Sequence, residues 1–186
     1  MLIHIQPPPS AYRCVPRGLG VACFGADQIL QYALGAGFPQ DVATQMVAIA
    51  LRESGGCPGA HNPGSPPGSE DSYGLWQINV KGNPTILSRL GLSNPSQLYD
   101  PATNAAAAYI LWGGNAANLN TAWYINQPGY QESYLANLPI AQAAADALGP
   151  ASDASLAAFP TLAGVPTWAW MLAAVAGIVF AGEVLD

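Results

Sequence analysis

The segment from residue 39 to residue 53 constrains the fold most, because its pattern is that of a helix that is apolar over much of its surface. Pro39 suits the first turn of a helix, and Asp41 suits the positive end of the helix dipole. A helix with so few polar positions is expected to be largely buried. It should therefore lie in the core and deliver Glu53 to the edge of that core. Its apolar positions are Val42, Met46, Val47, Ile49, Ala50 and Leu51.

The signals on either side of this segment predict a mainly helical domain. Residues 55–69 are rich in Gly and Pro and are expected to form a loop. Asp100 and Asn104 are interpreted as structural residues that cap a helix and tie the loop before it. The further helices are expected at residues 26–34, 84–90, 100–112, 120–124 and 131–138.

Glu53 has the features of a carboxylic acid that keeps its proton near neutral pH. Apolar surroundings and the negative end of the helix dipole both disfavour a charged carboxylate, so we expect its pKa to be raised. A purely structural residue at this end of a helix would more often be Lys or Arg. Cleavage of a glycosidic bond near neutral pH requires a protonated acid of this kind. The sequence therefore marks Glu53 as a candidate general acid.

The charge of the chain excludes nucleic acid as a partner. Only 9% of the residues are charged, the formal net charge is -6, and no basic residue follows Arg89. A basic patch that could hold a phosphate backbone cannot form on such a chain.

The cysteines and histidines predict neither a metal site nor a thiol enzyme. Cys14 and Cys23 could pair in an oxidising compartment and leave Cys57 free, but spacing alone does not decide this. Cys57 and His61 are neighbours in sequence, yet one such pair without further ligands is more often a chance feature of a loop. No histidine other than His61 follows Cys57, so a cysteine nucleophile lacks a distant base. We expect no metal and no cofactor.

Four segments in order carry a family resemblance. Glu53-Ser54 is followed by Ser-Tyr-Gly-Leu-Trp-Gln-Ile-Asn at residues 72–79 and by Asp-Pro-Ala-Thr-Asn-Ala-Ala at residues 100–106. A looser element, Ala-Trp-Tyr-Ile-Asn-Gln-Pro-Gly, occupies residues 122–129. Over residues 26–139 the chain resembles the lysozyme-like lytic transglycosylases and the related phage lysozymes. The resemblance implies a mainly α, lysozyme-like α+β fold. It also implies cleavage of the bond between N-acetylmuramic acid and N-acetylglucosamine in the glycan strands of peptidoglycan.

The resemblance further implies roles for individual residues. Glu53 would protonate the leaving glycosidic oxygen and then act as a base. In lytic transglycosylases of this kind the C6 hydroxyl of the sugar attacks and gives a 1,6-anhydro end, whereas a hydrolase needs a positioned water. Glu70 and Asp71 are the only candidates to activate a water, although adjacent acids in a loop are usually solvated. The residues expected to bind the glycan are Ser54, Ser72, Tyr73, Gln77, Tyr109 and Tyr124.

Several of these residues also have a structural interpretation. Ser54 could simply cap the end of its helix. Gln77 has an amide that suits an acetamido or hydroxyl group, but it could equally be a polar residue on an exposed face. Tyr124 or Tyr109 could orient the acid or line the groove. Either could instead be a core tyrosine, and Tyr109 fits that role better. Ser72 would open a short strand or turn that lets the backbone approach the sugar.

The composition changes near both ends of the catalytic domain. The last part of the chain has Trp168 and Trp170 near one end, where aromatic rings favour a membrane interface, so we expect a transmembrane helix. We divide the chain into a Pro-rich arm (1–24), a lysozyme-like catalytic domain (25–139), an Ala/Ser/Pro linker (140–160) and a hydrophobic C-terminal helix (161–186). Residues 140–159 of this linker also fit a low-complexity helix that packs weakly.

The hydrophobic helix has two further interpretations, as a buried hairpin helix of the soluble domain or as an assembly helix. Ala173, Gly177 and Ala181 are small and lie four residues apart, so a second helix could approach that face closely. The expected partners of this helix are therefore a membrane, virion proteins or an identical chain in a homo-oligomer.

We expect an enzyme of the phage virion that opens the bacterial wall locally during entry. An acidic protein gains nothing by diffusing over an anionic wall, and no secretion signal is evident at the start of the chain. The first alternative is a structural virion or membrane protein whose lysozyme-like domain only binds glycan. The second is a cellular wall-remodelling transglycosylase in the bacterial inner membrane, facing the periplasm. Glu53 favours catalysis, because a binding module needs no acid at that position.

Overall fold

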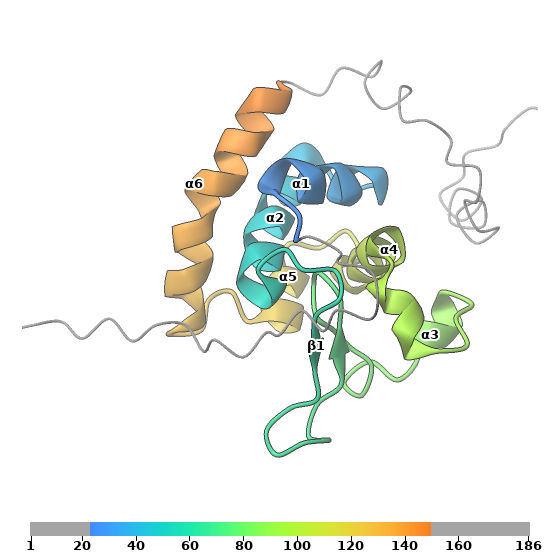
Figure 1. Ribbon diagram of the computed structural model, residues 1–186. Coiled ribbons are helices and arrows are strands. Elements are labelled where there is room, and N and C mark those ends of the chain that lie inside the picture. Colours follow the sequence, from blue (N-terminus) through green and yellow to red (C-terminus); the bar gives the residue numbers. More distant parts are fainter. Residues whose placement is uncertain (1–22, 150–186) are drawn as a thin grey trace, which may run out of the picture. The chain divides into compact units, whose positions relative to one another are not determined.

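The structure of the protein is a computed structural model, which describes residues 23–149 of the 186-residue chain (Figure 1). Helices dominate this range and one small sheet accompanies them, in agreement with the predicted lysozyme-like fold. The elements are α1 (Ala26–Gly35), α2 (Gln40–Ser54), β1 (His61–Asn62), β2 (Ser72–Tyr73), β3 (Ile78–Asn79), α3 (Ile86–Arg89), the 3-10 helix η1 (Pro95–Tyr99), α4 (Pro101–Trp112), α5 (Ala117–Trp123) and α6 (Tyr130–Leu148).

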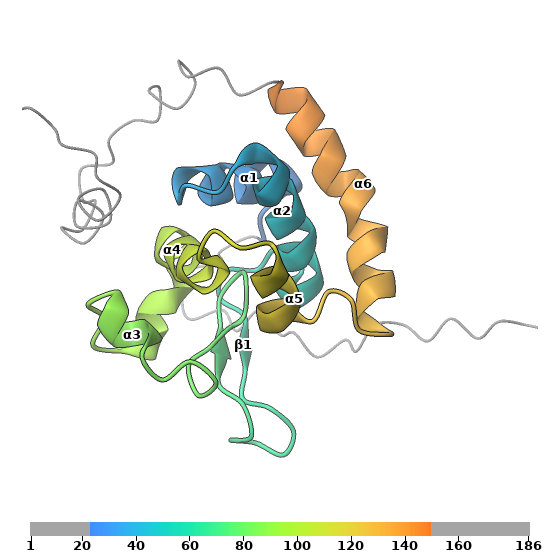
Figure 2. The ribbon, with the colours of Figure 1, turned by 180° about the vertical axis from the view of Figure 1, so that it is seen from behind.

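Helix α2 packs against both α1 and α6, and α1 also packs against α6, as Figures 1 and 2 show from opposite sides. The apolar run of α2 is buried as predicted, since Met46, Val47 and Ile49 have no exposed surface. The helix ends at Ser54 because Gly55 adopts a left-handed conformation, with φ of 62°. The last turn of a core helix therefore carries Glu53, as the sequence predicts.

The other predicted helices are found close to their expected positions. Helices α1, α3, α4 and α5 agree with the predicted ranges to within a few residues. Asp100 caps α4 as predicted, because its carboxylate accepts a hydrogen bond of 2.8 Å from the backbone N–H of Thr103.

The sheet consists of three short antiparallel strands in the order β1-β2-β3. Ser72 in the central strand pairs with Asn62 on one side and with Asn79 on the other. Gly74 follows the central strand with φ of 79°, and a Cβ atom at this position would collide with the side chain of Asn104. Only glycine allows this close approach, which brings the turn after β2 against α4.

The buried side chain of Asn104 joins the sheet to the helices. Its amide donates to the carbonyl oxygens of Tyr73 at 2.9 Å and Leu98 at 3.0 Å, and its oxygen accepts from the backbone N–H of Trp76 at 2.9 Å. The indole of Trp76 in turn donates to the carbonyl oxygen of Met46 in α2 at 2.8 Å. The structural role predicted for Asn104 is confirmed, and through Trp76 it fixes the sheet relative to α2.

Helix α6 is longer than the helix predicted at 131–138, and it takes in the first part of the segment that fits either a linker or a weakly packing helix. The helix continues through Pro139 to Leu148. Pro139 costs one backbone hydrogen bond, but the alanines that follow it have the highest helix propensity. Ala141 and Ala145 lie one turn apart and are buried, so packing of α6 against α1 and α2 stabilises the extended helix.

The cysteine pairing also differs from the one that spacing suggested. Cys23 forms a disulfide with Cys57, and their Cα atoms are 4.2 Å apart. Next to it, the backbone N–H of Phe24 donates to the carbonyl oxygen of Gly56 at 2.8 Å. The bond ties the start of the described range to the loop that follows α2. Cys14 lies outside the described residues.

Several expectations concern residues outside the range 23–149. They include the arm at 1–22, the linker at 150–160 and the hydrophobic helix at 161–186, with Trp168, Trp170 and the face of small residues. Within the described range, no helix combines the length and the apolar character that a membrane span requires.

The disulfide yields a stability prediction. Cys57→Ser, or reduction of the wild type, should lower the free energy of unfolding by about 2–4 kcal/mol, because the bond restricts the unfolded chain. Urea unfolding with and without reductant measures the change. Cys14→Ser, which leaves this bond intact, is the reference, and an unfolding curve unaffected by reductant would contradict the prediction.

Candidate active site

Glu53 lies in the last turn of α2, and its side chain is partly buried. Burial raises its pKa to about 7, against the lowering effects of a hydrogen bond from Tyr130 and of the positive charge of Arg52. The negative charge of Glu70 raises the pKa further. The raised pKa predicted from the sequence is confirmed, with loss of hydration as its largest cause. A carboxyl group of this kind is partly protonated at neutral pH.

A tyrosine of α6 holds the Glu53 carboxyl. The hydroxyl of Tyr130 donates to Oε1 of Glu53, and the guanidinium of Arg52 lies 4.2 Å from the centroid of the Tyr130 ring. This cation–π contact fixes the ring, and the hydroxyl fixes the carboxyl. Residues from α2 and from the first turn of α6 therefore form one half of the site.

Tyr124 and Tyr109 were predicted to orient Glu53 or to line the groove, but the described hydrogen bond to its carboxyl comes from Tyr130. Tyr124 caps the C-terminus of α5 with φ of 52° and is 54% exposed. Tyr109 packs against Phe38 at a centroid distance of 5.2 Å, as expected for a core tyrosine. The sequence does place Tyr130 directly after the last motif residue, but it does not reveal that α6 begins beside the end of α2.

Ser54 lies beneath the site. It is 1% exposed, and its hydroxyl donates to the carbonyl oxygen of Ala50 at 3.0 Å. This geometry favours the structural alternative, in which Ser54 completes the last turn of α2 and thereby sets the backbone of Glu53.

Gln77 braces the turn after β2. Its side-chain nitrogen donates to the carbonyl oxygens of Gly74 at 2.9 Å and Ala60 at 3.2 Å. The residue is 8% exposed and adopts φ of 47°, which is uncommon for a residue other than glycine. Its buried Oε1 has no hydrogen-bond partner among the described residues. Gln77 is thus not the exposed polar residue that was considered, and a contact with glycan stays a prediction.

The sheet presents an aromatic group next to the acids. Tyr73 stacks on His61 with ring centroids 4.5 Å apart and meets the edge of Tyr99 at 5.4 Å. Burial, together with a hydrogen bond to Asp71, raises the pKa of Tyr73 to about 12, so its hydroxyl stays protonated. The Tyr73 ring is partly exposed, which suits the predicted role in binding sugar.

The two adjacent acids of the loop are held by neighbouring side chains. Asp71 lies 2.8 Å from Nε2 of His61. Glu70 accepts hydrogen bonds from the buried Ser72 at 2.5 Å and from Asn62 at 3.0 Å. Both acids are therefore hydrogen-bonded within the protein and remain partly exposed. The Ser72 hydroxyl thus orients Glu70, and the predicted contact of Ser72 with glycan stays a prediction.

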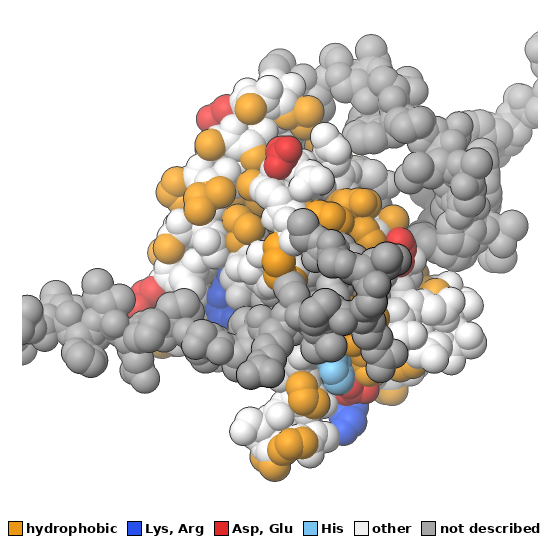
Figure 3. All heavy atoms as spheres, viewed as in Figure 1, with side chains coloured by type: hydrophobic (Ala, Val, Ile, Leu, Met, Phe, Trp, Pro, Cys, Tyr) orange, Lys and Arg blue, Asp and Glu red, His pale blue; other side chains and the backbone are white. Residues whose placement is uncertain are grey.

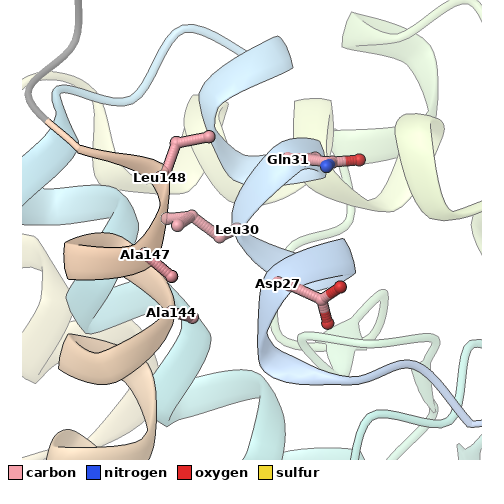
Figure 4. A pocket seen from close by; sticks show the side chains of 6 residues that line it. All are labelled: Asp27, Leu30, Gln31, Ala144, Ala147 and Leu148. Atoms are coloured by element: carbon pink, nitrogen blue, oxygen red, sulfur yellow. The ribbon is translucent and has the colours of Figure 1, made fainter.

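The remaining surface offers little further chemistry. A cavity of about 170 Å³ lies between α1 and α6, and Figure 4 shows its mostly apolar lining. Its lining residues are Asp27, Leu30, Gln31, Ala144, Ala147 and Leu148. It shares no residue with the Glu53 site, and it has a single carboxylate. Charged side chains are thinly spread over the face seen in Figure 3. Within residues 23–149, no group of three or more His, Cys, Asp or Glu is arranged to hold a metal ion.

Comparison with known proteins identifies the fold of this region. A family model described as a lysozyme-like domain matches residues 30–123, just over half of the chain. The match includes Glu53, the sheet and α4, and it ends before Tyr130 and α6. Neither the curated proteins nor the solved structures provide a match to the chain.

The raised pKa of Glu53 predicts a pH-dependent stability difference. The folded state holds a proton on Glu53 up to about pH 7, whereas the unfolded state loses it near 4.5, so this group's contribution to stability is lost as the pH rises through that window. Glu53→Gln removes the effect. Its unfolding free energy relative to wild type should rise by up to roughly 3 kcal/mol between about pH 4 and about pH 8, at about 1.4 kcal/mol per pKa unit.

Urea unfolding at both pH values measures this difference, and the exposed Glu132→Gln variant gives the reference for losing one carboxyl group. A relative stability of Glu53→Gln that is independent of pH would refute the assignment of the raised pKa.

Proposed function

Because the chain belongs to the lysozyme-like domain family, we propose that it cleaves the β-1,4 bond between N-acetylmuramic acid and N-acetylglucosamine in peptidoglycan. The lysozyme-like domain itself suggests a glycan-cleaving activity on peptidoglycan. One observation carries the finer proposal: Glu53 is partly buried, is held by Tyr130, and has a pKa of about 7.

Glu53 acts as the general acid in this reaction. It donates its proton to the glycosidic oxygen while the bond from that oxygen to the anomeric carbon breaks, and the positive charge that develops on the sugar is then quenched by an incoming hydroxyl group. An ordinary glutamic acid would be almost fully ionised at neutral pH, so the raised pKa is what keeps the proton available.

Tyr130 has two effects on this acid. Its hydrogen bond to Oε1 leaves Oε2 to carry the transferable proton, which directs that proton to one side of the carboxyl group. The same bond stabilises the charged carboxylate and limits how far burial raises the pKa. Tyr130 is therefore a positioning residue for Glu53.

The glycan is proposed to lie along the sheet side of the site. The partly exposed ring of Tyr73 offers an apolar face for a sugar, and the sparse charge of the domain suits a neutral glycan backbone better than a polyanion. Tyr124, which is exposed at the end of α5, stays a candidate to contact the glycan, as does the buried Gln77.

Delivery by a phage virion remains our proposal for the biological setting, with attachment through the apolar segment 161–186. The net charge of -6 disfavours free diffusion over an anionic wall, so attachment to a carrier would bring the enzyme to its substrate. The alternative setting is the bacterial inner membrane with the domain facing the periplasm. The Cys23–Cys57 disulfide fits action outside a reducing compartment in either case.

A glycan-binding structural protein is the second candidate function. Such a module needs neither an acid with a raised pKa nor a tyrosine that orients it, and so the Glu53–Tyr130 pair favours an enzyme.

Replacement of the acid gives the direct test of catalysis. Glu53→Gln should lower the rate of clearing of purified peptidoglycan sacculi by roughly 100- to 10,000-fold, because general acid–base catalysis contributes on this scale. Co-sedimentation with sacculi should still detect binding. The exposed Glu132→Gln variant is the control, and lysis by Glu53→Gln at the wild-type rate would exclude the proposed role.

Removal of the Tyr130 hydroxyl should shift the pH dependence of the reaction. The wild-type rate should fall as the pH rises through about 7, where Glu53 loses its proton. In Tyr130→Phe the charged carboxylate loses a donor, so its pKa rises and the decline in rate should move to higher pH.

The matched control is Tyr134→Phe, because Tyr134 lies one turn later in α6 and its hydroxyl contacts Gln45 at 3.4 Å. The profile of Tyr134→Phe should follow that of the wild type. A Tyr130→Phe profile that moves to lower pH, or does not move, would remove Tyr130 from the mechanism.

A further inference from the structure

Arg52 lies beside Glu53 in the last turn of α2, and Tyr130 holds its guanidinium group in place. The Cζ atom of Arg52 is 4.2 Å from the centroid of the Tyr130 ring, and the hydroxyl of the same ring donates to Oε1 of Glu53. The face of the ring thus contacts the cation, while its hydroxyl contacts the acid. A single tyrosine side chain therefore separates a positive charge from the proposed general acid.

The guanidinium group of Arg52 keeps donors that no described residue uses. Within residues 23–149 the ion pair that forms joins His61 to Asp71, and none involves Arg52. Its Nε atom is buried without a hydrogen-bond partner, whereas its terminal nitrogens, which also have none in this range, are not buried. The side chain as a whole is partly exposed. The N–H groups of both terminal nitrogens therefore reach the surface and can donate to a ligand.

Glu53 does not neutralise this cation. The two side chains form no salt bridge in the described part of the chain, and the carboxyl group of Glu53 bonds to Tyr130 instead. Burial raises the pKa of Glu53 to about 7, and the charge of Arg52 acts in the opposite direction. When Glu53 carries the proton that the reaction requires, Arg52 has no negative partner among the described residues.

The other basic side chains lie on different elements. The chain has a net charge of -6, and Lys81 and Arg89 are the remaining Lys and Arg of the described range. Lys81 donates to the carbonyl oxygen of Gly68 in the loop between β1 and β2, and Arg89 is exposed in the last turn of α3. A protein of this charge repels anions in general. An anionic group that approaches Glu53 is therefore attracted by Arg52 specifically.

The proposed substrate carries an anionic group next to the bond that Glu53 cleaves. That bond starts at C1 of N-acetylmuramic acid, and C3 of the same ring carries a lactyl ether. The carboxyl group of the lactyl ether is either free or joined to a stem peptide, which has carboxylates of its own, whereas the sugar rings are uncharged. A planar guanidinium group pairs with a carboxylate through two parallel hydrogen bonds. Arg52 is thus complementary to such a group in charge and in shape.

We propose that Arg52 is a specificity-determining residue, whose guanidinium group binds a carboxylate carried by the N-acetylmuramic acid next to the cleaved bond. This inference rests on the proposed function, in which Glu53 cleaves peptidoglycan. Arg52 thereby favours glycan with free carboxylates over glycan of the same backbone whose carboxylates are amidated. A purely structural role, in which Arg52 interacts with the C-terminus of α2 and with the Tyr130 ring, gives no such selectivity.

Two pairs of soluble substrates test the proposal and identify the source of the carboxylate. The first pair consists of glycan strands without stem peptides, with lactyl carboxylates that are free or converted to methylamides. The second pair carries stem peptides whose carboxylates are free or amidated. For wild-type protein, KM should be roughly 10-fold lower for the free member of at least one pair, the scale of a hydrogen bond to a charged group.

The pair that shows the preference names the source. A preference in the first pair assigns the lactyl carboxylate, and a preference confined to the second pair assigns the stem peptide. Equal KM values within both pairs would overturn the proposal. This comparison uses the wild-type protein alone, so it does not depend on whether a variant folds.

Variants of Arg52 connect the preference to this side chain. In Arg52→Gln the ratio of KM between the amidated and the free substrate should approach unity. In Arg52→Lys, which keeps the charge but not the planar fork, the ratio should be intermediate. Any loss of rate from a loosened Tyr130 ring affects both members of a pair alike, so the ratio isolates the contact with the carboxylate. Because this contact exists before and during bond cleavage, the ratio should appear in KM rather than in kcat. A wild-type ratio in Arg52→Gln would overturn the assignment.

Arg89→Gln is the matched control, because it removes the same charge from an exposed arginine at the end of another helix. Its KM ratio should equal that of the wild type. A loss of the ratio as large as in Arg52→Gln would show a general effect of net charge and overturn the proposal.

Failure of the proposed function would give a different result. Glu53→Gln should lose cleavage of every substrate in both pairs, and wild-type rates in this variant would refute Glu53 as the acid. Equal KM values within both pairs, together with cleavage that requires Glu53, would refute the role of Arg52 alone.

Discussion

The buried amide of Asn104 is the interaction on which the geometry of the site depends. It satisfies three backbone groups at once, at Tyr73, Trp76 and Leu98, and the indole of Trp76 carries the connection to Met46 in α2. The position of the sheet relative to α2 follows from this network. Leaving any of these groups unpaired in the core would cost about 1–3 kcal/mol. The network around Asn104 is therefore strongly specified, and with it the position of the sheet relative to α2.

Two carboxyl groups, Glu53 and Glu70, have environments that differ. Glu53 lies at the end of a buried helix, where loss of hydration raises its pKa and a single tyrosine limits the shift. Glu70 lies on the hairpin, where two fixed donors surround its oxygens. The difference arises from the secondary structures that present them.

Much of the fold could be predicted because its signals are local. The apolar period of α2, the Asp-Pro start of α4 and the glycine-rich loop each depend on neighbouring residues only. The sequence left open whether the chain beyond Pro139 forms a linker or a helix, because the burial of Ala141 and Ala145 depends on α1 and α2. The Cys23–Cys57 bond was missed for a similar reason: spacing favours near neighbours, whereas pairing requires proximity in space.

The sequence by itself determined that an acid stands at the end of a buried helix with a raised pKa, since burial and helix direction are properties of that one segment. Only the tertiary structure decided which groups act on that acid. Tyr130 reaches it from 77 residues away, and Glu70 acts on it from a hairpin whose loop composition alone indicated solvated charges. Side chains from separate elements meet only after the core has packed, and no local pattern encodes that meeting.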